Sequence, residues 1–404
     1  MHASDRGART RHAHLIAAGV LTLGLVGDAM LYAVLPAAAA TYAVGPTGVA
    51  LALSLNRFVR LLLNPLAARA LARIGLRTGT LLGAVLAVVS TAAYAIAPGL
   101  LALLAARVVW GASFATLRLT MLAYATLDAR HAPRRLGSAT ALQELAPAVL
   151  LVLGAAALGW LGVRGLFLAL AALTLVSVPL ALALPLAPAS VPSAPSAPGT
   201  DAARDETSDR RTRPWGPAGV ATAVAFGVDG VLMAGVVLAL IALGWSPLAA
   251  AQTGGVLLAT RKVVQVVVSA LAGRAGERFG VMRVVRAGTL ATALALAVMA
   301  AGPWQPPFLL VGAVAAMIAA SLVATLIPAV VAGGDTRTHL AQLAWLANAR
   351  DLGAALGAAA APLVLMGTAR AEAVSLVFGL AAALALVALA LWRREPGREA
   401  CTEG

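Results

Sequence analysis

The chain is poor in charged residues, aromatic residues and cysteine. Only 11% of its 404 residues are charged and 4% are aromatic, whereas 61% are hydrophobic and the mean hydropathy is +0.91. Soluble domains carry about 25% charged residues, and a soluble chain of this length could not bury so much apolar surface. The composition excludes a soluble enzyme, a coiled coil, a disordered chain and a secreted disulfide scaffold, and it predicts that apolar surface faces lipid.

Several chemistries lack the residues that they require. The single cysteine, Cys401, can form neither an intrachain disulfide nor a cysteine-based metal site. There is neither a phosphate-binding glycine loop nor a nucleophile elbow. We therefore expect no enzymatic activity, no cofactor and no metal. A histidine proton relay is also excluded, because all five histidines fall outside the expected membrane spans: His2, His12, His14, His131 and His339.

Long apolar stretches make up most of the chain. A helix needs about 20 apolar residues to cross a bilayer. Twelve stretches meet this requirement: 15–40, 48–68, 79–97, 99–125, 137–161, 165–186, 216–243, 247–271, 287–302, 307–331, 340–366 and 371–392. They predict an all-α membrane protein with twelve transmembrane helices in two six-helix bundles.

A proline-rich and then charged segment, 187–215, divides the spans into six plus six and is typical of a disordered linker. We therefore expect five regions. They are a cytoplasmic N-tail (1–14), an N-terminal bundle (15–186), a cytoplasmic linker (187–215), a C-terminal bundle (216–392) and a cytoplasmic C-tail (393–404).

Arginine placement predicts the orientation. If both termini are cytoplasmic, the cytoplasmic segments hold 21 arginines and the outer loops hold two, Arg164 and Arg370. This asymmetry follows the positive-inside rule. It also accounts for the net charge of +14, because basic loops attract anionic lipid headgroups; no nucleic-acid partner is expected. With the Ala- and Arg-rich composition, it predicts a multi-pass protein of the bacterial cytoplasmic membrane.

The two halves of the sequence repeat each other. Residues 56–75 align with residues 261–280 at a constant offset, and two shorter matches have nearly the same offset. The aligned pairs are Arg57 with Lys262, Arg60 with Gln265, Asn64 with Ser269, Glu144 with Asp351 and Asp28 with Asp229. This pattern predicts a duplication of six spans, as in transporters with two related halves.

Ionisable residues inside spans are the main candidates for function. Each costs about 2.5–3.5 kcal/mol at the bilayer centre, so it must pair or line a wet cavity. The candidates are Asp28, Arg57, Arg60, Arg107, Arg118, Glu144, Asp229, Arg261, Lys262, Arg350 and Asp351, with the polar Asn64 and Gln265 on the same helix faces.

Seven of the eleven charges are basic and four are acidic, so pairing alone leaves three positive charges. Two functional interpretations remain open, and a third interpretation is that some of these residues form structural salt bridges. The arginines bind an anionic substrate group, or they are counter-ions that tune Asp28, Asp229, Glu144 or Asp351 for proton coupling.

The sequence resembles the major facilitator superfamily over essentially its whole length. Gly273-Arg-Ala-Gly-Glu277-Arg278-Phe-Gly280 is similar to the family's loop motif, and Arg73-Ile-Gly75-Leu-Arg77 is a first copy with Ala72 at the acidic position. Arg107-Val-Val-Trp-Gly111 and the segment from Asp28 to Leu35-Pro36 resemble further family motifs. The resemblance implies alternating access driven by an ion gradient. It also implies gating roles for Arg73, Gly75, Arg77, Gly273, Glu277, Arg278 and Gly280.

We therefore expect a monomeric secondary transporter whose partners are a small molecule, protons and membrane lipids. Proton-coupled export of a drug-like compound or metabolite is the first expectation, because the acidic first span together with Arg107 is similar to that of proton-linked exporters. Proton-coupled uptake of an organic anion is the alternative. A non-transporting membrane sensor or a membrane enzyme is the alternative of another class.

Overall fold

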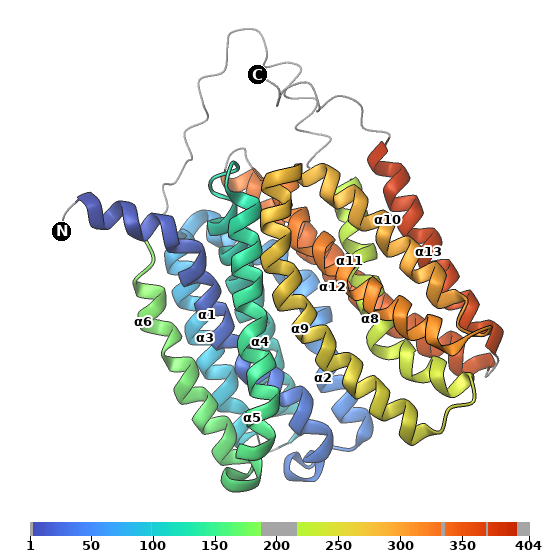
Figure 1. The fold of residues 1–404 in the computed structure, drawn as a ribbon. Coiled ribbons are helices and arrows are strands. Elements are labelled where there is room, and N and C mark those ends of the chain that lie inside the picture. Colours follow the sequence, from blue (N-terminus) through green and yellow to red (C-terminus); the bar gives the residue numbers. More distant parts are fainter. Residues whose placement is uncertain (1–2, 98, 187–215, 333–335, 369–370, 394–404) are drawn as a thin grey trace.

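The computed structural model describes residues 3–97, 99–186, 216–332, 336–368 and 371–393, which are almost entirely helical (Figure 1). The first half contains α1 (Ala3–Ala37), η1 (Ala39–Tyr42), α2 (Pro46–Ile74), α3 (Leu76–Ile96), α4 (Leu100–Thr126), α5 (Ala132–Leu175) and α6 (Ser177–Leu182). The second half contains α8 (Pro217–Ala242), α9 (Pro247–Phe279), α10 (Val281–Ala300), α11 (Pro306–Val330), α12 (Thr336–Thr368) and α13 (Ala371–Arg393). The proposed linker 187–215 lies outside the described residues.

Helix α5 is two helices joined at Gly162. This residue has φ 65°, a conformation that favours glycine, so the chain turns there and runs back through α6. The turn lies between the predicted spans 137–161 and 165–186. With α5 divided there, the described helices are consistent with twelve spans. Eight of the described helices are individually long and apolar enough to cross a membrane. A ninth is added if the two parts of α8, which are bent by 49°, form one span.

The duplication is visible in the backbone. Gly75 and Gly280 occupy equivalent positions in the repeat, and each separates two helices with almost the same φ, 83° and 84°. Because glycine has no Cβ atom, the backbone can turn sharply at both positions, between one span and the next. The turns after α2 and α9 are therefore related features of two similar halves.

Each half contains an apolar cluster, and the cluster of the first half also includes Leu340 and Leu343 of α12. One cluster contains Leu21, Trp110 and Leu117 of the first half, and another contains Leu240, Leu296 and Phe378 of the second half. The halves meet where α2 packs against α12 and where α5 packs against α9. These two contacts are equivalent under the repeat, because α9 corresponds to α2 and α12 corresponds to α5.

The beginnings of α1 and α8 and the ends of α6 and α13 lie at one end of the molecule, which we call the terminal end (Figure 1). Near this end α5 and α9 are in close contact. A Cβ atom added to Gly137 would lie 2.6 Å from the carbonyl oxygen of Ser269, and a Cβ atom added to Gly273 would lie 2.8 Å from the carbonyl oxygen of Pro133. Toward the opposite end the two helices diverge (Figure 1). The halves are thus closely packed at the terminal end.

Candidate functional site

The four intramembrane carboxylates each lie against one cation. Asp28 pairs with Arg107 and Asp229 with Arg261, each within one half of the molecule. Asp351 pairs with Arg60 and Glu144 with Lys262, each across the two halves. Four of the seven intramembrane cations are neutralised in this way, and Arg57, Arg118 and Arg350 remain without a carboxylate partner among the described residues.

The pair of Asp28 and Arg107 is part of a fixed network in the first half. Arg107 of α4 is fully buried and binds the Asp28 carboxylate through Nη1. Its Nε donates to the carbonyl of Ala52 at 2.9 Å, and its Nη atoms lie 3.3 Å from the Tyr94 hydroxyl and 3.4 Å from the Tyr32 hydroxyl. A guanidinium with all three nitrogens engaged is held firmly. The sequence did not single out the two tyrosines.

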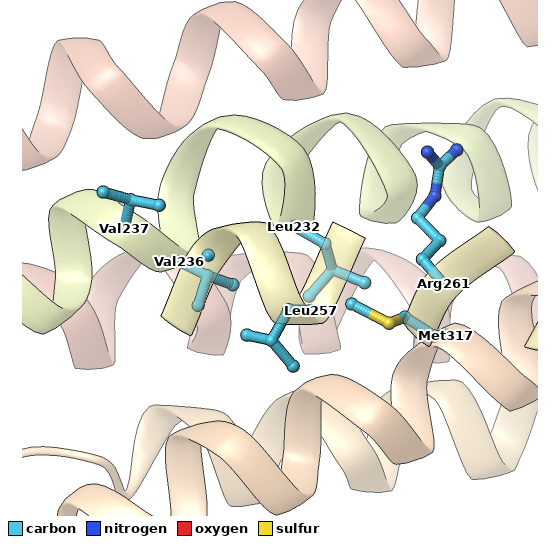
Figure 2. A pocket seen from close by; sticks show the side chains of 7 residues that line it. Leu232, Val236, Val237, Leu257, Arg261 and Met317 are labelled. Atoms are coloured by element: carbon cyan, nitrogen blue, oxygen red, sulfur yellow. The ribbon is translucent and has the colours of Figure 1, made fainter. Parts of the chain in front are cut away.

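Asp229 is equivalent to Asp28 in the repeat, but its partner Arg261 lies on α9, the counterpart of α2, and not on the counterpart of α4. Nε and Nη2 of Arg261 donate to the two carboxylate oxygens of Asp229, which is the bidentate arrangement that arginine forms with carboxylates. The same arginine borders a small pocket, otherwise lined by apolar residues and a glycine (Figure 2): Leu232, Val236, Val237, Gly254, Leu257 and Met317.

The contact between α2 and α12 is polar at its centre. Arg60 Nη2 donates to Asp351 Oδ1 at 2.9 Å, and both side chains are more than 90% buried. Asn64, one turn along α2, donates to Asp351 Oδ2 at 3.3 Å and to Asn348 Oδ1 at 2.9 Å. Asn348 in turn donates to the backbone carbonyl of Leu61 at 3.0 Å. The polar stripe predicted on α2 thus faces the second half.

The contact between α5 and α9 is the counterpart. Lys262 Nζ donates to Glu144 Oε2 at 2.8 Å. The other oxygen of Glu144, Oε1, accepts a hydrogen bond from Gln143 Nε2 at 3.1 Å. The side-chain oxygen Oε1 of Gln143 in turn accepts a hydrogen bond from Arg118 of α4. Glu144 and Asp351 are equivalent in the repeat, but their cations are not, because Lys262 aligns with Arg57 and Arg60 aligns with Gln265. The pseudo-symmetry therefore relates the two carboxylates, and their partners lie one helical turn apart in the repeat.

The three surplus arginines lie near this interface. Arg118 is buried, with 8% of its surface exposed. Arg350 lies over the rings of Phe114 and Phe226, at 5.1 and 5.2 Å, and one of its Nη atoms is buried without a hydrogen-bond partner among the described residues. Arg57 is partly buried on α2.

Phe114 also contacts Arg60, whose guanidinium lies 4.5 Å from the ring centre. One aromatic ring therefore touches a cation from each half. Cation–π contacts hold such groups in place without neutralising them. The site thus combines buried positive charge with aromatic surface, which suits an anionic group.

The predicted gating residues lie at or near the terminal end. Gly75 and Gly280 form the two turns, and Arg73, Glu277 and Arg278 are exposed. Arg77 donates to the carbonyl of Leu182 at 2.6 Å, at the end of α6 in its own half. Gly273 lies within α9 rather than in a loop, where it allows α5 to approach.

Two further polar residues of the repeat lie on α9. Gln265 has a buried carbonyl oxygen without a hydrogen-bond partner in the described part of the chain. The Ser269 hydroxyl lies 3.0 Å from that of Thr325 on α11. Neither residue joins the ion pairs.

Comparison with known proteins supports the fold. The family model described as Major Facilitator Superfamily matches residues 17–261. No curated protein matches the chain. Among solved structures, the human organic anion transporter MFSD10 has a TM-score of 0.70 at 18% identity, over 95% of this chain and 99% of that one.

Two sugar transporters are equally similar in structure. The fucose:proton symporter FucP of E. coli has a TM-score of 0.72 at 14% identity, covering 94% of this chain and 98% of that one. The proton:xylose symporter XylE has a TM-score of 0.74 at 12% identity, covering 97% of each chain. At these identities the similarity concerns the fold alone.

Proposed function

Because the chain belongs to the major facilitator superfamily, and is therefore a membrane transporter, we propose that it moves a small organic anion across the bilayer by alternating access. The observation that carries this proposal is the surplus of three buried or partly buried arginines: Arg57, Arg118 and Arg350. Uncompensated charge inside a membrane protein is costly, and a bound anion would neutralise it.

The chemistry of the surplus cations favours particular ligands. Arginine recognises carboxylate and phosphate groups through its planar fork of donors. Phe114 and Phe226 add aromatic surface next to Arg350, so a carboxylate attached to an apolar or aromatic group fits best. MFSD10, described as an organic anion transporter, has a similar fold. The sugar symporters share that fold equally well, so the proposal depends on charge rather than on fold.

The proposed orientation places the terminal end in the cytoplasm of a bacterium, because most arginines outside the spans lie on that side. The close contact of Gly137 with Ser269 and Gly273 then closes the interface between the halves on its cytoplasmic side. In this arrangement the anion enters from outside and leaves after the halves rock apart at the terminal end.

Proton-coupled export of a drug-like compound is the second candidate. It is supported by the apolar lining of the pocket beside Arg261, which includes Leu232, Val236 and Leu257 (Figure 2). Such a lining suits a hydrophobic molecule. The excess of positive charge disfavours a cationic drug, so a neutral or acidic compound would be exported.

Counterflow in proteoliposomes tests the proposal. Purified protein is reconstituted in vesicles that are preloaded with unlabelled benzoate, and entry of labelled benzoate in excess of that into protein-free vesicles is measured with the same pH on both sides. We expect exchange of benzoate and none of labelled glucose or tetraphenylphosphonium. Arg350→Gln should reduce benzoate exchange. Exchange of the cation or the sugar, without benzoate exchange, would overturn the proposal.

A further inference from the structure

The four ion pairs of the membrane region differ in what happens to them when the halves move. Asp28 and Asp229 are paired within one half, so a rigid rotation of the halves leaves those pairs intact. Glu144 and Asp351 are paired with a cation of the opposite half, so separation of the halves breaks both pairs. Only the second kind of pair senses whether the interface is closed.

The cross-half pair of Glu144 and Lys262 lies directly above the closed contact. Glu144 follows Gly137 by two helical turns on α5, and Lys262 precedes Ser269 by two turns on α9, which is about 10 Å along each helix. Gly137 and Ser269 are in contact. The ion pair therefore lies at the interface between the halves, two helical turns from the closed contact at the terminal end.

We propose, building on the anion transport proposed above, that Glu144 and Asp351 are the proton carriers of the transporter and act as internal counter-ions. The substrate anion takes their place beside Lys262 and Arg60. Each displaced carboxylate then binds one proton from the water of the open side. Two protons and one monovalent anion enter the site together, so the net charge of the site rises by one, and the broken pairs release the two halves.

The surroundings of the two carboxylates fit this exchange. Glu144 interacts with Lys262 and Arg261 of α9 and with Arg118 of α4, while α11, which also packs against α5, has no charged residue.

Asp351 interacts with Arg60 of α2, with Arg118 of α4 and with its neighbour Arg350. The only charged residue of α8, which packs against α12, is Asp229, and Arg261 holds it. A carboxylate that loses such cations while shielded from water binds a proton.

The first experiment separates coupling from binding. Glu144→Gln and Asp351→Asn are reconstituted and tested for benzoate counterflow and for accumulation of benzoate driven by a pH gradient. Both are measured as the excess over protein-free vesicles, because protonated benzoic acid crosses a bilayer unaided. We expect measurable counterflow in both variants and a loss of gradient-driven accumulation of about tenfold, the size of a typical coupling energy. Asp128→Asn, in the loop after α4, is the matched control and should accumulate normally. Normal gradient-driven accumulation by both interface variants would overturn the inference.

The second experiment needs no substrate. Spin labels are attached to Thr78→Cys and Arg283→Cys in a Cys401→Ser background; both positions are exposed and equivalent in the repeat. Acidification should lengthen the distance between the labels in the parent protein. The double variant E144Q/D351N should have the longer distance at every pH.

A distance in the parent that does not respond to pH would overturn the inference. Failure of the parent protein to exchange benzoate, together with a pH-dependent distance, would contradict the proposed function and not the proton-binding role of the two carboxylates.

Discussion

Gly137 of α5 and Gly273 of α9 meet with no side chain between them: an ideal Cβ on Gly137 would lie 2.9 Å from the Gly273 Cα atom. The two helices belong to different halves, so this contact closes the molecule at the terminal end. Any larger residue at either position forces the backbones apart.

Gly273→Ala should therefore favour the state in which the terminal end is open. The added methyl group would lie 2.8 Å from the Pro133 carbonyl oxygen, and backbone atoms cannot move aside as a flexible side chain does. We expect the label distance between positions 78 and 283 to lengthen and transport to fall. Gly159→Ala is the control, because a Cβ at Gly159 meets nothing within 4 Å. An unchanged distance in Gly273→Ala would contradict this account of closure.

Asp28→Asn should destabilise the protein by about 3–5 kcal/mol, because it leaves the fully buried Arg107 without its counter-ion. The melting temperature of the purified protein measures this loss. The double variant Asp28→Asn/Arg107→Gln should recover part of it, since no unpaired charge remains. If the double variant is as unstable as the single one, the pair is not the source of the stability.

Phe114→Leu should weaken anion binding without removing any charge. The ring lies 4.5 Å from the guanidinium of Arg60 and 5.1 Å from that of Arg350, and each contact contributes about 0.5–2 kcal/mol. We expect the KM of benzoate exchange to rise, and the melting temperature to fall because Phe114 is buried in the core cluster of the first half. Phe308→Leu, at an exposed position of α11, is the control.

Lys262→Arg should impair transport even though the positive charge is kept. The compact ammonium of Lys262 reaches Glu144 with one short contact, whereas a guanidinium presents a wider, planar fork of donors. Rates of benzoate exchange in the two proteins test this prediction. Equal rates would mean that charge alone matters at this position.

Asp128 predicts a small pH effect outside the membrane. Partial burial raises the pKa of Asp128, but the hydrogen bond from His131 and the charges of Arg135 and His131 lower it more. The pKa of Asp128 is therefore below its ordinary value of 3.8. The stabilisation is therefore present above pH 3.8 and is lost as the pH falls through the lowered pKa.

For an exposed pair this stabilisation amounts to about 0–1 kcal/mol. Asp128→Asn should melt slightly below the parent protein at neutral pH, and the difference should vanish in acid. A difference that persists in acid would mean that the carboxylate charge is not its cause.

Much of the fold was predictable because membrane spans leave a strong signal in composition. The apolar stretches, the glycines at 75 and 280 and the three surplus cations follow from residue counts and spacing alone. The partners in each ion pair were not predictable: Arg60 and Asp351 are 291 residues apart, and several other carboxylates were equally plausible. Only the packing of α2 against α12 selects between them.

Aromatic residues were the main omission in the site. Tyr32, Tyr94, Phe114 and Phe226 all contact intramembrane arginines, directly through the ring or through the hydroxyl. In an apolar helix an aromatic residue looks like any other lipid-compatible side chain, so the sequence gives no separate signal. The expected gating role of Arg77 also depended on tertiary structure, because its acceptor is a carbonyl at the end of α6.

The symmetry of the contacts between halves suggests how such a molecule could arise. In the repeat, α2 against α12 and α9 against α5 are the same contact made twice, as in an isologous dimer of identical chains. Two copies of a six-helix ancestor would thus have formed both contacts, with both carboxylates, from one set of residues. After gene fusion each copy can diverge, and the two pairs now take their cations from positions that are not equivalent, Arg60 in α2 and Lys262, the counterpart of Arg57, in α9.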